Sequence, residues 1–107
     1  MPTIVYTVRA TCNDLAQRGR FLAWLAPDHV EAVKAGGADS VRITLYDPET
    51  PGGRPALETQ YTFPSRKAFE AYLRDHAPAL RADGLKHFPP ESGVTFERRT
   101  GELGYAS

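Results

Sequence analysis

The sequence predicts an α+β domain with the element order βαββαβ, which is the ferredoxin-like arrangement. Four short runs alternate apolar and polar residues, the period of a half-buried strand. Two longer runs repeat their apolar residues at helical spacing. Strands are expected at residues 3–10, 39–46, 56–63 and 94–99, and helices at 13–35 and from 65 to about 80. This order predicts a four-stranded antiparallel sheet with two helices on one face.

The first strand and helix have clear local signals. Thr11 and Asp14 have the spacing of a capping box at the start of the helix. Pro27 cannot donate a backbone hydrogen bond, so a kink or a restart is expected there. The pair Gly36 and Gly37 ends the helix.

The second half begins with a hairpin around a long loop, residues 47–55, that is rich in turn-forming residues. Ser65 is a good N-cap for the second helix. Pro78 disfavours helical backbone before it, so this helix should break near His76, with a short turn to Gly84. The tail from about residue 101 has no periodicity and should be loosely held.

Composition limits the possible functions. The 107 residues fit one domain, and the formal net charge is zero, with 13 basic and 13 acidic side chains. No basic stripe suggests a nucleic acid or an anionic membrane as partner. We expect no signal peptide and no bilayer-spanning segment. Cys12 is the single cysteine, so a reducing cytoplasm is the expected compartment.

The two faces of the predicted sheet differ in polarity. One is apolar and should be covered by the helices, whereas the other carries Thr, Arg, Glu, Gln and Tyr side chains. An antiparallel sheet can leave such a face in water, with weak cross-strand ion pairs. We favour a homodimer in which the polar sheet faces of two copies meet around a twofold axis.

Three segments resemble a bacterial family of unknown function in the dimeric α/β-barrel group of ferredoxin-like domains. These are residues 21–37 (FLAWLAPDHVEAVKAGG), the pair Gln60 and Tyr61, and residues 76–88 (HAPALRADGLKHF). The likeness extends from Ile4 to about Arg99. Positions that match the family are Trp24, His29, Gln60, Tyr61, His76, Leu80, Gly84 and Phe88.

The resemblance implies a dimer of two packed sheets, with a cavity in each subunit either between sheet and helices or within the barrel. The wider group includes cofactor-free monooxygenases, haem-degrading enzymes, lactone isomerases and polyketide cyclases. The chain departs from the family pattern at Pro27, in the loop 47–55 and at residues 89–93. The family carries no established reaction, and fold alone does not identify one.

His29 and His76 are the candidate catalytic residues. Each lies late in a predicted helix at a position that should face inward, so the two imidazoles could approach each other. They could act as a base and its orienting partner, or bind a metal or haem iron. The structural alternative is that each donates to a carbonyl at a helix end. No Cys, His and Asp spacing supplies a metal site.

Four further residues are candidates for binding a substrate. Trp24 could pack on the chain after Pro78, cover the mouth of a pocket or meet a neighbour. Arg42, Tyr46 and Gln60 share the polar sheet face and could bind an anionic or phenolic ligand inside a barrel. Their alternative role is hydrogen bonding across the dimer.

Two functional hypotheses follow. The first is an enzyme without organic cofactor that acts on a small aromatic or polyketide-like molecule. His29 or His76 would be its base, and Arg42, Tyr46 and Gln60 would orient the substrate. The second is a non-catalytic dimeric module that binds a ligand or a protein. A closed, mainly apolar cavity that holds one of the histidines would favour the enzyme.

Overall fold

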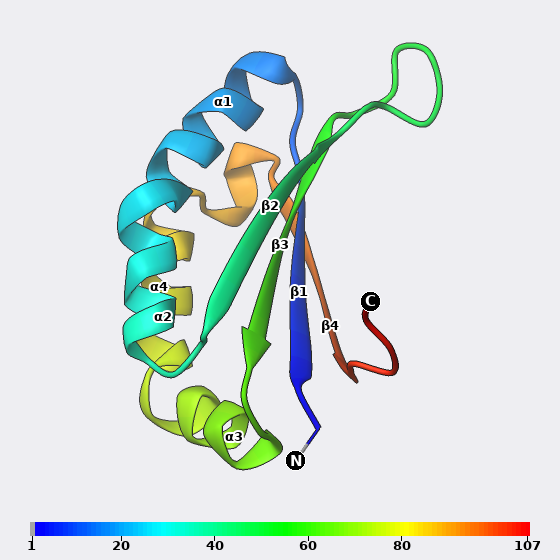
Figure 1. Ribbon diagram of the computed structural model, residues 1–107. Helices are drawn as coiled ribbons and strands as arrows, with labels where there is room; N and C mark the ends of the chain where they lie inside the picture. Colours follow the sequence, from blue (N-terminus) through cyan, green and yellow to red (C-terminus); the bar gives the residue numbers. More distant parts are fainter. Residues whose placement is uncertain (1) are drawn as a thin grey trace.

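The computed structural model describes residues 2–107, which form a four-stranded antiparallel sheet with helices on one face (Figure 1). The strands lie in the order β2-β3-β1-β4. Their bounds are β1 (Ile4–Thr11), β2 (Ser40–Tyr46), β3 (Ala56–Phe63) and β4 (Thr95–Glu102). The predicted α+β, ferredoxin-like class is confirmed.

The first helical region is interrupted, as Pro27 predicts. It consists of α1 (Leu15–Trp24), a wide turn (Leu25–His29) and α2 (Val30–Ala35). Ala26 has extended backbone angles (φ −124°, ψ 134°), because a proline disfavours helical backbone in the preceding residue. The predicted capping residue is wrong: Thr11 belongs to β1, and the carboxylate of Asp14 accepts the amide N–H of Gln17 at 2.8 Å.

The second helical region contains a full helix that the sequence did not predict. After α3 (Arg66–Asp75), the chain turns at His76 and continues as α4 (Ala77–His87), where only a short turn was expected. Pro78 lies in the first turn of α4, where the missing N–H would have no partner in any case. The predicted cap of α3 is confirmed, since Ser65 Oγ accepts from the amide of Ala68 at 3.1 Å.

The core lies between the sheet and the helices. It includes an aromatic cluster in which the ring of Phe63 lies 5.1 Å from those of Phe69 and Tyr72. The ring of Tyr6 lies 5.3 Å from that of Phe69. Aromatic pairs at such distances stabilise a fold beyond the area that they bury. This cluster fixes α3 against the inner face of β1 and β3.

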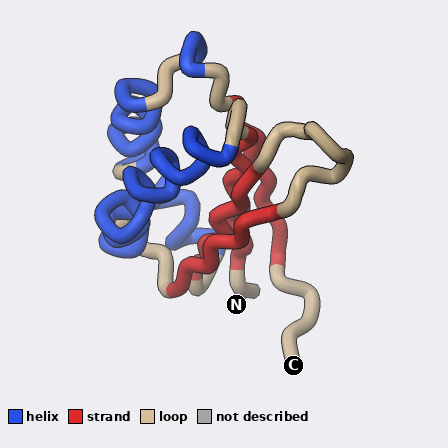
Figure 2. The backbone as a smooth tube through the Cα atoms, turned by 90° about the horizontal axis from the view of Figure 1, so that it is seen from above, coloured by secondary structure: helices blue, strands red, loops and turns tan. Residues whose placement is uncertain are grey.

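The outer face of the sheet carries no helix (Figure 2). Its polar side chains interact within the chain: Glu58 accepts from Arg9 at 2.8 Å and lies 3.5 Å from Arg99. The guanidinium of Arg9 also lies over the ring of Tyr46, 5.4 Å from its centroid. Tyr46 remains 40% exposed. The polarity that the sequence predicts for this face is therefore present.

The loop 47–55 projects beyond the end of the sheet (Figure 1). At its base, Arg54 donates to the carbonyl of Thr11 at 3.3 Å. At the other end of the sheet, β4 continues to Glu102, past the predicted end at Arg99, because pairing with β1 persists to Ile4. The amide of Leu103 then donates to the carbonyl of Thr3 at 2.8 Å.

Candidate functional site

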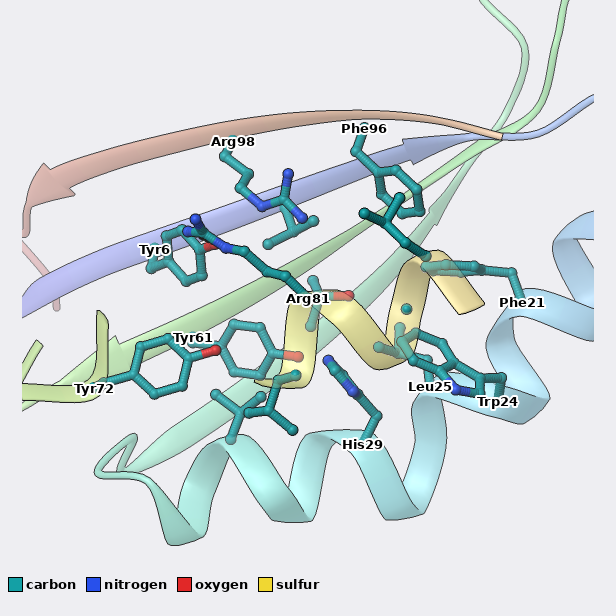
Figure 3. Close-up of a pocket in the computed structure, with 16 residues that line it drawn as sticks. Tyr6, Phe21, Trp24, Leu25, His29, Tyr61, Tyr72, Arg81, Phe96 and Arg98 are labelled. Carbon is teal, nitrogen blue, oxygen red and sulfur yellow. Dashed lines mark hydrogen bonds between the residues drawn. The ribbon is translucent and has the colours of Figure 1, made fainter. Parts of the chain in front are cut away.

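A cavity of about 170 Å³ lies between the inner face of the sheet and the helices (Figure 3). Its walls come from β1, β3, β4, the region around the Leu25–His29 turn, α3 and α4. The lining residues are Tyr6, Val8, Phe21, Trp24, Leu25, His29, Val33, Thr59, Tyr61, Tyr72, Leu80, Arg81, Gly84, Leu85, Phe96 and Arg98.

Strand register explains why space remains at this place in the core. Val8 pairs with Thr59 on one side, so two small side chains meet at the middle of the inner face, and with Arg98 on the other side. The larger residues Tyr6 and Tyr61 pair two residues further along the same strands. Alternation sends every second side chain inward. The sheet therefore provides a shallow floor with an aromatic border.

The helix wall of the cavity depends on the bend at Ala26. Phe21 and Trp24 approach from the end of α1, with ring centroids 5.5 Å apart. Gly84 of α4 lies against the indole, and a Cβ there would be 3.4 Å from Trp24. The indole thus lies next to the chain after Pro78, which is one of the placements that the sequence left open, and it also lines the cavity.

His29 follows the bend and faces the cavity with its ring 4.4 Å from that of Trp24. Burial lowers the pKa of the imidazole below its ordinary value, and the nearby Asp83 carboxylate partly opposes that effect. A lowered pKa keeps the ring neutral at pH 7. Within residues 2–107, no side chain or carbonyl forms a hydrogen bond with this ring. A neutral imidazole of this kind can accept a proton.

Three buried tyrosines, Tyr6, Tyr61 and Tyr72, add hydroxyl groups to the same cavity. Burial raises the pKa of Tyr61, and neighbouring tyrosines add to the effect. Burial likewise raises the pKa of Tyr72 to about 12. The hydroxyls of Tyr61 and Tyr72 therefore stay protonated and can donate hydrogen bonds. Figure 3 shows the Tyr61 hydroxyl directed toward His29.

Two arginines complete the cavity, and sequence reasoning missed both. Arg81 of α4 donates to the Tyr6 hydroxyl at 3.1 Å. Arg98 of β4 lies beside Phe96, with its guanidinium 5.7 Å from the ring centroid. A signal for Arg98 was available, because strand alternation places it on the same side as Phe96. No comparable signal existed for Arg81, since α4 itself was not predicted.

His76 does not face inward. It occupies the junction of α3 and α4, where its exposed ring stacks on that of Tyr72, with centroids 6.4 Å apart. It also packs against Gly36, where an added Cβ would lie 3.0 Å from the imidazole. The helix ends at Asp75, so the periodicity used to place His76 does not hold at that residue. His76 is not among the residues that line the cavity.

Arg42, Tyr46 and Gln60 lie on the outer face of the sheet. Arg42 and Gln60 are directly opposite each other on β2 and β3. Both are exposed, as is Tyr46. The sheet separates these three residues from His29. The six residues predicted for one site therefore lie in three places: Trp24 and His29 in the cavity, His76 at the helix junction, and the other three on the outer face.

Other reactive groups lie outside the cavity. Cys12 is fully buried, and desolvation raises the pKa of its thiol, so the reactive thiolate is disfavoured. No cluster of three or more potential metal ligands occurs within the part of the chain that the structure describes. In that same part, no helix has both the length and the hydrophobicity needed to cross a membrane.

The sheet order and the cavity together define a ferredoxin-like α+β domain with space for a small molecule between its two layers. The chain belongs to the DUF4286 family, a domain of unknown function, whose family model matches residues 3–101. No curated protein matches the sequence.

Solved structures share the fold at low sequence identity. A dimeric ferredoxin-like protein from an uncultured marine organism has a TM-score of 0.72 and 16% identity, with 100% of both chains covered. A second protein of that description has a TM-score of 0.73 and 10% identity, over 98% of this chain and 97% of the other. A variant of SnoaB, a cofactor-independent oxygenase from Streptomyces nogalater, has a TM-score of 0.69 and 11% identity, over 99% and 97%. At such identities the likeness shows the fold alone.

Proposed function

We propose that the protein is a small cofactor-free enzyme that binds a ring-containing molecule in the cavity and removes a proton from it with His29. The observation that carries this proposal is a partly buried imidazole, held neutral, in a cavity lined by aromatic rings and hydroxyl groups. The fold shared with a cofactor-independent oxygenase also supports it.

The proposed chemical step is proton transfer from a phenolic hydroxyl, or from a carbon activated by a neighbouring carbonyl, to the His29 imidazole. The substrate then carries a phenolate or enolate oxygen. The hydroxyl of Tyr61 is directed toward the same region (Figure 3) and can donate a hydrogen bond to that oxygen. Such an anion is the starting point for oxygenation, isomerisation or cyclisation.

Exchange of carbon-bound hydrogen with solvent tests this step without knowledge of the natural substrate. 2-Tetralone has two fused rings and an acidic C–H next to its carbonyl. In D₂O buffer, NMR should show that the protein exchanges this hydrogen faster than buffer alone. General bases typically contribute about 10²–10⁴-fold, so His29→Gln should lose the acceleration. His76→Gln, outside the cavity, is the matched control and should retain it.

A non-catalytic binding module is the second candidate function. It is favoured by the absence, within residues 2–107, of any hydrogen-bonding partner that would orient the His29 ring. Under this alternative, 2-tetralone changes the fluorescence of Trp24, the single tryptophan, while exchange stays at the buffer rate. Loss of acceleration in His76→Gln but not in His29→Gln would contradict the assignment of the base.

We further propose that two copies form a homodimer through the outer faces of their sheets. Two structures that share the fold are described as dimeric. The outer face is polar, and its residues Arg42, Tyr46 and Gln60 are exposed. An isologous contact would cover these residues, which then serve the interface rather than the cavity.

Light scattering after gel filtration tests the dimer, with an expected mass near twice 11.8 kDa. Tyr46→Asp places a charge on the outer face and should shift the protein toward monomer. Tyr105→Asp makes the same change in the exposed tail, 85% exposed at that residue, and should not. A monomeric wild type would overturn the proposal.

The proposed compartment is the bacterial cytoplasm. Cys12 is fully buried and has no second cysteine with which to form a disulfide within the chain. Disulfides are rare in reducing compartments, where buried thiols persist. Fractionation of a native host with an antibody against the protein would test this placement, and recovery from the periplasm would contradict it.

A further inference from the structure

We infer that the cavity is built for an aromatic anion, whose negative group is bound by Arg81 and Arg98. The inference rests on the proposed function in one respect, namely that the same cavity binds a ring-containing molecule. It adds the charge of that molecule and the residues that recognise it.

The charge of the cavity lining is one-sided. Among the 16 lining residues, Arg81 and Arg98 are cationic, and none is Asp or Glu. Neither arginine has a carboxylate oxygen within 4.0 Å in the described chain, residues 2–107. The outer face of the sheet differs, because Arg9 and Arg99 there share the Glu58 carboxylate.

The two guanidinium groups come from opposite walls. Arg98 projects inward from β4, opposite Val8 on β1, and Arg81 reaches in from α4 to the Tyr6 hydroxyl. Figure 3 shows both groups on the Tyr6 side of the cavity. The positive charges of both also act to lower the pKa of the Tyr72 hydroxyl, against the larger effect of burial. The two charges therefore reach one shared region.

A bound anion would reduce the repulsion between the two guanidinium groups. Two like charges without counter-charges repel each other, and a carboxylate can accept from two guanidinium groups at once. The hydroxyl of Tyr72 stays protonated and can donate as well. Phe21 and Trp24 offer apolar rings from α1, and Phe96 offers a third beside Arg98. This arrangement suits a molecule with an aromatic body and a carboxylate or similar group at one end.

Arg81 and Arg98 line the cavity and are also exposed to solvent. The anionic group would therefore lie at the mouth of the cavity. Solvent and salt weaken charge pairs in such positions. Binding of the anion should therefore weaken as NaCl is added, while binding of a neutral analogue should not.

A charged and a neutral probe of equal size provide the test. Calorimetric titration at pH 7.5 would compare 2-naphthoate with 2-naphthamide. We expect wild type to bind the carboxylate about tenfold more tightly. Arg81→Gln and Arg98→Gln should each weaken 2-naphthoate binding by about three- to tenfold and leave 2-naphthamide binding unchanged. Arg20→Gln removes the same charge from an exposed position of α1 outside the cavity and should change neither. Circular dichroism would establish that all three variants fold.

The outcomes separate this inference from the proposed function. Equal affinity of wild type for both probes would overturn the inference and leave the aromatic cavity as a binding site. A preference for 2-naphthoate that survives both cavity substitutions would also overturn it. If neither probe binds to wild type, the inference fails together with the binding step of the proposed function.

Discussion

At the scale of single residues, the two predicted catalytic histidines differ in what surrounds them. His29 is partly buried beside Trp24 and faces a cavity, and burial lowers its pKa. His76 is exposed at a helix junction and stacks on Tyr72. Only His29 combines a proton-accepting form with access to space that a ligand could occupy, which is why the proposed chemistry uses it.

His29 predicts a pH dependence of stability. Its pKa in the folded protein lies below the ordinary value of 6.5, so the unfolded chain takes up the proton first as pH falls. The stability associated with the neutral ring is complete above about pH 6.5 and decreases as pH falls below it, until both states are protonated. Urea unfolding at pH 7.5 and pH 5.5 should show a larger loss for wild type than for His29→Gln. Equal losses would contradict the burial argument.

At the scale of elements, α4 completes the cavity. It contributes Leu80, Arg81, Gly84 and Leu85 to the lining. Gly84 lies against the indole of Trp24: a Cβ there would be at contact distance, 3.4 Å, and a longer side chain would have to displace the ring. Glycine inside a helix costs about 0.5–1 kcal/mol relative to alanine.

A matched pair of glycine substitutions tests the contact between α4 and Trp24. Gly84→Leu should destabilise the protein by about 1–3 kcal/mol, because the new side chain collides with the indole. Gly19→Leu, in an exposed position of α1 with no neighbour within 4 Å, should stabilise it by about 0.5–1 kcal/mol. Chemical unfolding followed by circular dichroism measures both. Similar effects of the two changes would exclude the proposed packing role of Gly84.

At the scale of the whole molecule, the sheet separates two surfaces with different proposed roles. Its inner face forms the floor of the cavity, and its outer face is the proposed dimer interface (Figure 2). On the outer face, Arg9 and Arg99 form ion pairs with Glu58 of the same chain. Dimerisation would therefore bury a surface on which three charged side chains already interact with one another.

The cavity predicts opposite effects of one substitution on stability and on binding. Val8→Leu adds a methylene group to the cavity floor and should raise the free energy of unfolding by about 0.8 kcal/mol, since it fills empty space. It should also weaken 2-naphthoate binding about tenfold. Val5→Leu makes the same change at an outward-facing position of β1 and should leave binding unchanged. Unaltered binding in Val8→Leu would show that the probe does not occupy this cavity.

Much of the fold followed from local patterns. Alternation in the strands located the apolar face and the polar face, and Pro27 indicated the break between α1 and α2. The helix after Pro78 was missed because proline ends one helix and can also begin the next. Arg81, which lies in this helix, was not predicted as a cavity residue for the same reason.

The candidate site was harder to predict than the fold. Placing Trp24 beside Gly84 requires the angle of the bend at Ala26, which no local pattern determines. Likewise, pairing Val8 with both Thr59 and Arg98 requires the strand register. A cavity arises from long-range packing, so a single sequence indicates its residues only one element at a time.

The alternation of β1 allows each surface to be redesigned separately. Tyr6 and Val8 project toward the cavity, whereas Thr7 and Arg9 project to the other side, so even and odd positions belong to different surfaces. A library randomised at Tyr6 and Val8 would sample new ligand preferences without altering the exterior. One randomised at odd positions would sample new assemblies around an unchanged interior. Ligand binding and assembly could thus be changed independently through substitutions in one strand of eight residues.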